Sequence, residues 1–176
     1  MGLRSFKESD LRTISDALYI AEDATVNFYK FSAGEWKRHC YEVKTQASLS
    51  KGGITSDVFA LLNKGVALIN SFELKTKNYD FYLICLQDHK ILKAMTRDTQ
   101  LGLLPLLVYI LTHELVHIVR FCNFSQRFDV SRTKRDREEG IVHDTTFKIL
   151  GGLSLPKLDY VLDIYQGHRM GARAFL

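Results

Sequence analysis

The stretch LGLLPLLVYILTHELVHIVRF, residues 101–121, opens with the longest apolar run of the chain, residues 101–111. Interrupted by Pro105, this run is too short to span a bilayer, which takes about 20 apolar residues as a helix. Pro105 itself suits a first helical turn, where the N–H that it lacks would have no partner. The stretch therefore predicts a buried helix from about Pro105 to Phe121.

The second half of this helix contains the motif HELVH, residues 113–117. His113 and His117 are four residues apart, so both imidazoles lie on one helix face and can bind the same metal ion. Glu114 is displaced by one residue, which places its carboxylate near a metal-activated water whose proton it can accept. Chance would produce this pattern in roughly one chain in a hundred of this composition. The motif therefore predicts Zn²⁺-dependent hydrolysis with Glu114 as the general base.

A catalytic zinc site needs a third protein ligand, because three ligands leave the fourth position for water. The metzincin pattern is excluded, since Arg120 and Asn123 stand where that motif requires glycine and histidine. Further along the chain, Glu139 and His143 are four residues apart, so on a helix both would face the same way. Both residue types bind zinc, and the spacing alone does not separate them.

The motif HELVHIVRF, followed after a basic stretch by RDREEGIVHDTTF, resembles the SprT-like zinc metalloproteases, a zincin group. In that family HExxH is followed by a polar or basic loop, and then by a histidine with an aromatic residue four positions later. The resemblance implies that His113 and His117 are ligands, that Glu114 is the base and that His143 is the third ligand. Phe147 matches the aromatic position.

A second zincin group offers a different third ligand. The thermolysin-like gluzincins take it from ExxxD on a following helix, which would make Glu139 the ligand, although His143 replaces the aspartate. Asp144 stands where the SprT-like pattern has glycine, but the aromatic partner fits, so His143 is preferred. The zincin comparison also implies that an edge strand, DFYLICLQ at residues 80–87, pairs with an extended peptide. The apolar character of that strand equally predicts a central core strand.

The composition is that of one globular domain. The chain has 176 residues, with 46% apolar residues, 25% charged residues and two prolines. A single zincin-like domain over residues 1–176 is therefore expected. The N-terminal segment lacks the apolar core of a secretory signal, and the three cysteines form no CxxC pair. A cytoplasmic protein without membrane contact is expected.

Periodicity along the rest of the chain predicts an α+β fold, with a long amphipathic helix over residues 7–31. The positions expected on the apolar face of this helix are Leu11, Ile14, Leu18, Ala21, Val26 and Phe28. The elements expected after it are a strand within 39–47, a helix over 55–70, two strands within 72–88, an ambiguous segment at 89–95, a loop over 123–134, a helix over 135–153 and a last helix over 154–167 with Ser154 as its cap.

The net charge of +4 is concentrated between residues 120 and 137. This segment contains two aspartates and six basic residues, namely Arg120, Arg127, Arg132, Lys134, Arg135 and Arg137. Such a cluster can contact phosphate groups, and the resemblance adds that SprT-like proteases are DNA-associated. The expected function is a peptidase that acts on peptide or protein substrates. The alternative is a non-catalytic, metal-stabilised module that binds nucleic acid or an acidic partner through this segment.

A peptidase also needs a donor that stabilises the developing oxyanion. Residues of suitable type lie near the C-terminus, namely Tyr160, Tyr165, His168 and Arg169. The sequence does not select one of the four.

Overall fold

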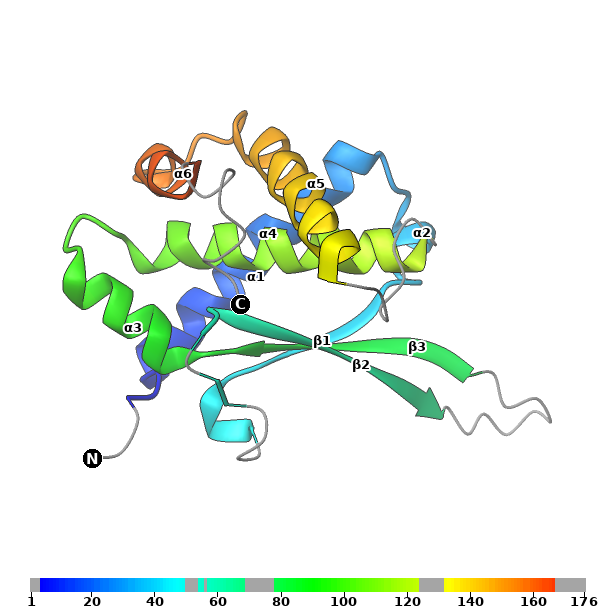
Figure 1. The fold of residues 1–176 in the computed structure, drawn as a ribbon, viewed down its shortest axis with the longest axis horizontal. Helices are drawn as coiled ribbons and strands as arrows, with labels where there is room; N and C mark the ends of the chain where they lie inside the picture. Colours follow the sequence, from blue (N-terminus) through cyan, green and yellow to red (C-terminus); the bar gives the residue numbers. More distant parts are fainter. Residues whose placement is uncertain (1–3, 50–53, 56, 69–77, 124–131, 167–176) are drawn as a thin grey trace.

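The computed structural model describes residues 4–49, 54–55, 57–68, 78–123 and 132–166. The elements in chain order are α1 (Glu8–Tyr29), α2 (Ala33–Trp36), β1 (Cys40–Lys44), the short 3₁₀ helix η1 (Gln46–Ser48), β2 (Ala60–Leu68), β3 (Asn78–Leu86), α3 (Asp88–Arg97), α4 (Leu103–Cys122), α5 (Arg132–Leu150) and α6 (Leu158–Gln166). The sheet lies on one side of α4, and α5 and α6 lie on the other (Figure 1). The predicted α+β class is confirmed.

Helix α4 forms the centre of the hydrophobic core. All residues from Pro105 to Val119 are buried, so the helix is covered on every side. By length and composition alone α4 could cross a membrane, but 83% of its most apolar 18-residue window is buried inside the protein. Such burial is typical of a core helix, because apolar side chains are stabilised by leaving water.

Helix α1 packs along α4, and it confirms the long helix predicted for residues 7–31. Its buried face differs in part from the expected one, since Leu11 and Phe28 are 44% and 42% exposed. Ala17, which was not among the expected positions, is fully buried, as is the expected Ala21. Small side chains at these positions let the two helices approach closely, because the distance between packed helices depends on the side chains at the contact.

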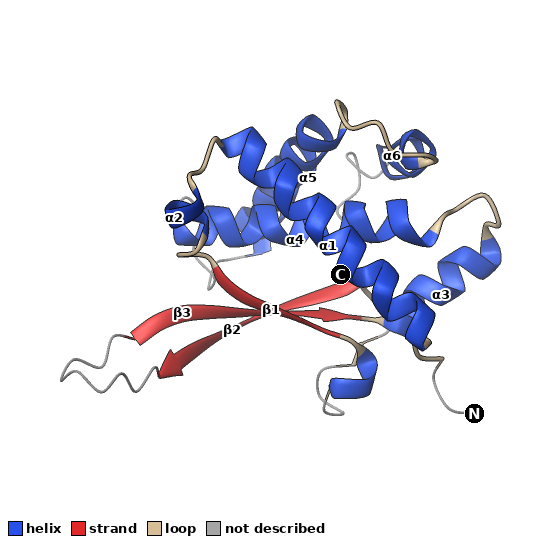
Figure 2. Cartoon of the chain, turned by 180° about the vertical axis from the view of Figure 1, so that it is seen from behind, coloured by secondary structure: helices blue, strands red, loops and turns tan. Residues whose placement is uncertain are grey.

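Strand β3 is the central strand of the sheet, whose order is β1-β3-β2. It runs parallel to β1 and antiparallel to β2, as the view from behind also shows (Figure 2). Tyr82, Ile84 and Leu86, at alternate positions, are fully buried. The expected pairing of residues 80–87 with a peptide is wrong, because both hydrogen-bonding edges of β3 are occupied by neighbouring strands. Among the described residues, β1 and β2 form the edges.

The helix expected over residues 55–70 is also wrong, since most of this segment forms β2. The pairs run from Ala60 opposite Leu86 to Leu68 opposite Asn78. Pairing with another strand outweighs the helical preference of this segment. The local periodicity of a sequence carries no information about such pairing. The first of the two strands expected within 72–88 falls largely outside the described residues, whereas the second is β3.

Helix α3 resolves the ambiguous segment at 89–95. Its first residue, Asp88, is fully buried, and its carboxylate accepts hydrogen bonds from the backbone N–H groups of Phe6 and Gln46, both at 3.0 Å. A carboxylate is also favourable at a helix N-terminus, where the backbone dipole is positive. Asp88 thereby joins the chain before α1 to η1 and α3.

The boundaries of the last two helices differ from those expected. Helix α5 begins at Arg132, inside the expected loop, and ends at Leu150, before two glycines as predicted. Helix α6 begins at Leu158 rather than after Ser154. Lys157, immediately before α6, has a φ of 66°, a left-handed conformation that cannot belong to a right-handed helix.

Replacing Leu107 in α4 by alanine should lower the free energy of unfolding by about 2–5 kcal/mol, because this fully buried side chain would leave a cavity. The matched change Leu11→Ala, on an exposed part of α1, should alter it by about 0.5 kcal/mol or less. Urea denaturation followed by circular dichroism measures both values. Equal losses in the two variants would contradict the central position of α4.

Candidate metal centre

Helix α4 directs a row of four rings, spaced four residues apart, along one face. They are Tyr109, His113, His117 and Phe121, and the centroids of successive rings lie 6.5, 4.9 and 6.0 Å apart. The row follows from helix geometry, since residues i and i+4 lie one turn apart on the same face. His113 and His117 are only 3% and 7% exposed. The two histidines of HELVH are therefore neighbours inside the protein.

Helix α5 crosses α4 and brings Glu139 and His143 to these histidines (Figure 1). One carboxylate oxygen of Glu139 lies 3.4 Å from His113 Nε2, and the other lies 3.2 Å from His117 Nε2. The ring centroid of His143 lies 4.8 Å from that of His113. Glu139 and His143 therefore share one helix face, as their spacing predicted.

An ion pair fixes the crossing of the two helices beside the site. The Arg120 guanidinium donates two hydrogen bonds to one carboxylate oxygen of Glu138, at 3.0 and 2.6 Å. Both side chains are less than one-fifth exposed, so solvent ions screen this pair less than a surface pair. Because Glu138 immediately precedes Glu139, the ion pair helps to hold α5 in position at the candidate metal centre.

The donor atoms have separations that suit a metal ion. Two donors bound at about 2.0–2.1 Å to one tetrahedral zinc ion lie about 3.3–3.4 Å apart. The two contacts of Glu139 with His113 and His117 are 3.4 and 3.2 Å. In addition, ligand atoms of His113, Glu139 and His143 all lie within 4.8 Å of one another. The residues present therefore fit a divalent ion that prefers imidazole and carboxylate ligands, such as zinc.

Tyr109 orients His143. The tyrosine hydroxyl lies 3.1 Å from His143 Nδ1, and a hydrogen bond at this nitrogen leaves metal ligation to Nε2. Tyr109 is fully buried, and burial raises the pKa of its hydroxyl, which stays protonated. The sequence-based prediction missed Tyr109. Its position four residues before His113, on the same helix face, was the signal that could have identified it.

Burial and neighbouring charges set opposite pKa shifts on two glutamates. Burial raises the pKa of Glu114, which is 7% exposed, and the nearby His113 and His117 oppose this shift. Burial also acts to raise the pKa of Glu139, but hydrogen bonds from His113 and His117 outweigh it and hold the pKa well below its usual range. Glu139 is therefore an ionised acceptor between two imidazoles, whereas Glu114 is the more basic carboxylate.

Of the four residues considered as oxyanion donors, one lies next to the site residues. Tyr165 is 7% exposed and stacks on Tyr109 with a centroid distance of 5.1 Å, and burial raises its pKa to about 12. The hydroxyl of Tyr160 instead donates to the Asp98 carboxylate at 2.7 Å. The other two, His168 and Arg169, lie outside the described residues.

The basic segment 120–137 is only partly a free positive surface. Arg120 is neutralised by Glu138. Lys134, Arg135 and Arg137 are exposed on the first turns of α5. Arg127 and the side chain of Arg132 fall outside the part of the chain that the structure describes.

Comparisons of this chain with protein-family models, curated proteins and solved structures give no match. The structure defines an α+β domain in which two crossed helices bring histidines and a carboxylate together. The SprT-like and gluzincin resemblances rest on the motif residues alone.

Changing Tyr109 to phenylalanine should weaken zinc binding about 10- to 100-fold, because His143 loses the hydrogen bond that orients its ring. Competition with a chromophoric chelator measures the zinc dissociation constant. Tyr160→Phe is the matched control, since it removes a hydroxyl bonded to Asp98 instead, and its zinc affinity should equal that of the wild type. An unchanged affinity in Tyr109→Phe would rule out the orienting role.

Proposed function

We propose that this protein is a zinc-dependent peptidase with a zincin-like arrangement, in which α4 and α5 hold the metal and Glu114 is the general base. The observation that carries the proposal is the convergence of His113, His117 and Glu139, with Glu114 buried on the same helix. A chance HExxH pattern would give no reason for a second helix to direct a carboxylate at both histidines. The proposed substrate is a peptide or an unfolded protein segment.

We assign the metal to His113, His117 and Glu139, with His143 beside them. The 3.4 and 3.2 Å contacts join Glu139 to both histidines, whereas His143 is held by Tyr109 through Nδ1. This assignment corresponds to the gluzincin alternative and departs from the preference for His143 that the SprT-like motif suggested. Three protein ligands leave one position for water, as a catalytic site requires.

The chain supplies the proton transfers of the reaction. A bound zinc ion would act as a Lewis acid, polarising the peptide carbonyl and making a water molecule more acidic. Glu114 accepts the proton of the attacking water and delivers it to the leaving amine. Its buried position makes it a stronger base than an exposed glutamate, because burial raises its pKa. Glu139 remains ionised, the state in which a carboxylate binds a metal ion.

Glu114→Gln should reduce kcat/KM on an unstructured protein substrate by about 100- to 10,000-fold, because an amide cannot accept the proton. Its zinc content should equal that of the wild type, since Glu114 is not a proposed ligand. Glu8→Gln, at an exposed position of α1, is the matched control and should keep full activity. Wild-type activity should vanish with a chelator and return with zinc. Full activity in Glu114→Gln would exclude the proposed mechanism.

Metal content distinguishes the two third-ligand assignments. Glu139→Ala should purify with little zinc, because it removes the carboxylate that contacts both histidines. His143→Ala should retain zinc with an affinity reduced about 10- to 100-fold, as expected for a residue that supports the ligands. Elemental analysis and chelator competition measure both quantities. Zinc loss in His143→Ala with retention in Glu139→Ala would reverse the assignment.

A second function is favoured by one observation, the presence of a fourth zinc-binding side chain, His143, beside the three proposed ligands. His113, Glu139 and His143 form one group of possible ligands, and Glu139 also contacts His117. Four protein ligands would leave no position for water, and the site would be structural. The protein would then be a metal-stabilised module whose exposed Lys134 and Arg135 contact nucleic acid. Retained zinc without hydrolysis, together with salt-sensitive DNA binding that is lost on neutralising Lys134 and Arg135, would establish this function.

A further inference from the structure

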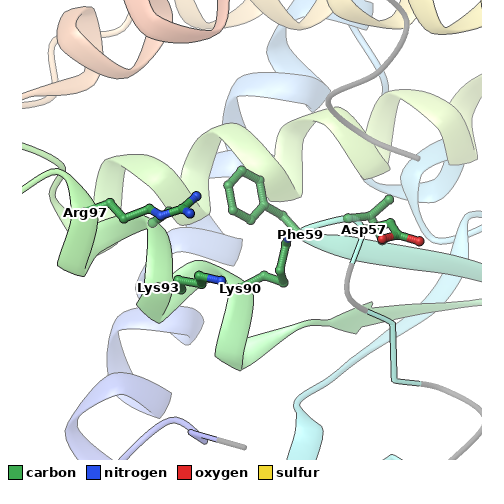
Figure 3. A pocket seen from close by; sticks show the side chains of 7 residues that line it. Asp57, Phe59, Lys90, Lys93 and Arg97 are labelled. Carbon is green, nitrogen blue, oxygen red and sulfur yellow. The ribbon is translucent and has the colours of Figure 1, made fainter.

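A pocket of about 120 Å³ lies between α3 and the segment that leads into β2. Its walls include Phe59 on one side and Lys90, Lys93 and Arg97 of α3 on the other. In Figure 3 the side chain of Arg97 extends from α3 toward the ring of Phe59. The two walls are joined by the Gln87 backbone N–H, which donates to the Phe59 carbonyl at 2.8 Å. The volume exceeds the roughly 10–15 Å³ that one water needs, so a carboxylate side chain has room to enter.

The pocket carries an excess of positive charge. Lys90, Lys93 and Arg97 occupy positions i, i+3 and i+7, so they lie on one face of α3. Within the described part of the chain, no ion pair joins any of them to a carboxylate. Asp57 also lines the pocket, but its carboxylate points away from the three cations (Figure 3). Three cations around one small cavity suit a single anionic group, whereas a nucleic acid engages a longer row of cations.

A chain of aromatic contacts links this pocket to the metal centre. The ring of Phe59 packs edge to face on Tyr165 at 5.9 Å, and Tyr165 stacks on Tyr109 at 5.1 Å. The centroid of Tyr109 lies 6.5 Å from that of His113. Added end to end, these steps place Phe59 within about 18 Å of His113. An extended peptide advances roughly 3.3–3.6 Å per residue, so about five residues cover that distance.

We propose that this basic pocket holds an acidic side chain of the peptide that the metal centre hydrolyses, at a distance from the cleaved bond that about five extended residues can span. The inference rests on the proposed function and deepens it, because it names the class of substrate as peptides with a glutamate or aspartate at a fixed distance from that bond. The three cations attract the carboxylate, and the Phe59 ring packs against the methylene groups that carry it.

The test measures peptide binding separately from hydrolysis. Zinc-loaded Glu114→Gln protein is titrated into fluorescently labelled peptides of about ten residues. Each peptide carries one glutamate in an otherwise uncharged sequence, and the position of this glutamate differs from peptide to peptide. Matched peptides with glutamine at the same positions are the controls. At the best position, glutamate should improve the dissociation constant about tenfold, the effect of a few partly exposed ion pairs. The preference should shrink in about 0.5 M salt, which screens exposed charges.

Charge reversal identifies the pocket as the origin of this preference. The double change Lys93→Glu and Arg97→Glu, at two exposed positions, should abolish or invert the preference for glutamate. Arg12→Glu, on an exposed part of α1, is the matched control and should retain the preference.

Wild-type protein that hydrolyses peptides without a glutamate preference would overturn the pocket inference and leave the peptidase proposal standing. A preference that charge reversal removes, in a protein that hydrolyses nothing, would support the pocket and refute the peptidase. Binding of a single-stranded oligonucleotide, lost on the same charge reversal and without any glutamate preference, would also overturn the inference.

Discussion

The carboxylate of Glu139, held between two buried histidines, is the contact on which the centre of this protein depends. Burying a charged or polar group without a partner costs free energy, roughly 1–3 kcal/mol for a neutral hydrogen-bonding group and more for an ion. The 3.4 and 3.2 Å contacts with His113 and His117 offset that cost for all three side chains. They also determine where α5 crosses α4, so the same contact serves both packing and the proposed metal chemistry.

The rest of the fold makes this contact possible. Helix α1 and the sheet cover α4 on its other sides, so the remaining side is the one that faces α5. The Arg120–Glu138 ion pair then fixes the crossing one residue away from Glu139. Because every proposed ligand lies on a helix, its position is set by packing rather than by a loop, which gives a metal site the geometric precision that it needs.

The sequence predicted the elements whose signal is local. The apolar composition of α4 and the long amphipathic period of α1 identified these two helices. The two glycines that follow α5 identified where that helix ends. The helix prediction for residues 55–70 was wrong because β2 forms only through its pairing with β3. The apolar residues of that segment fit both a helical and a strand period. The same limit applies to residues 80–87, since the apolar composition of a strand does not reveal whether its edges are paired.

For the candidate site, the sequence alone predicts which side chains share a helix face. The four-residue spacings of His113 with His117 and of Glu139 with His143 are fixed by the pitch of the α-helix. The packing of α4 against α5 is what brings the two faces together, so that Glu139 contacts both histidines and Tyr109 holds His143. The physical reason is that helical spacing acts within a few residues, whereas the crossing of α4 and α5 results from burial and ion pairing between segments that are distant in the chain.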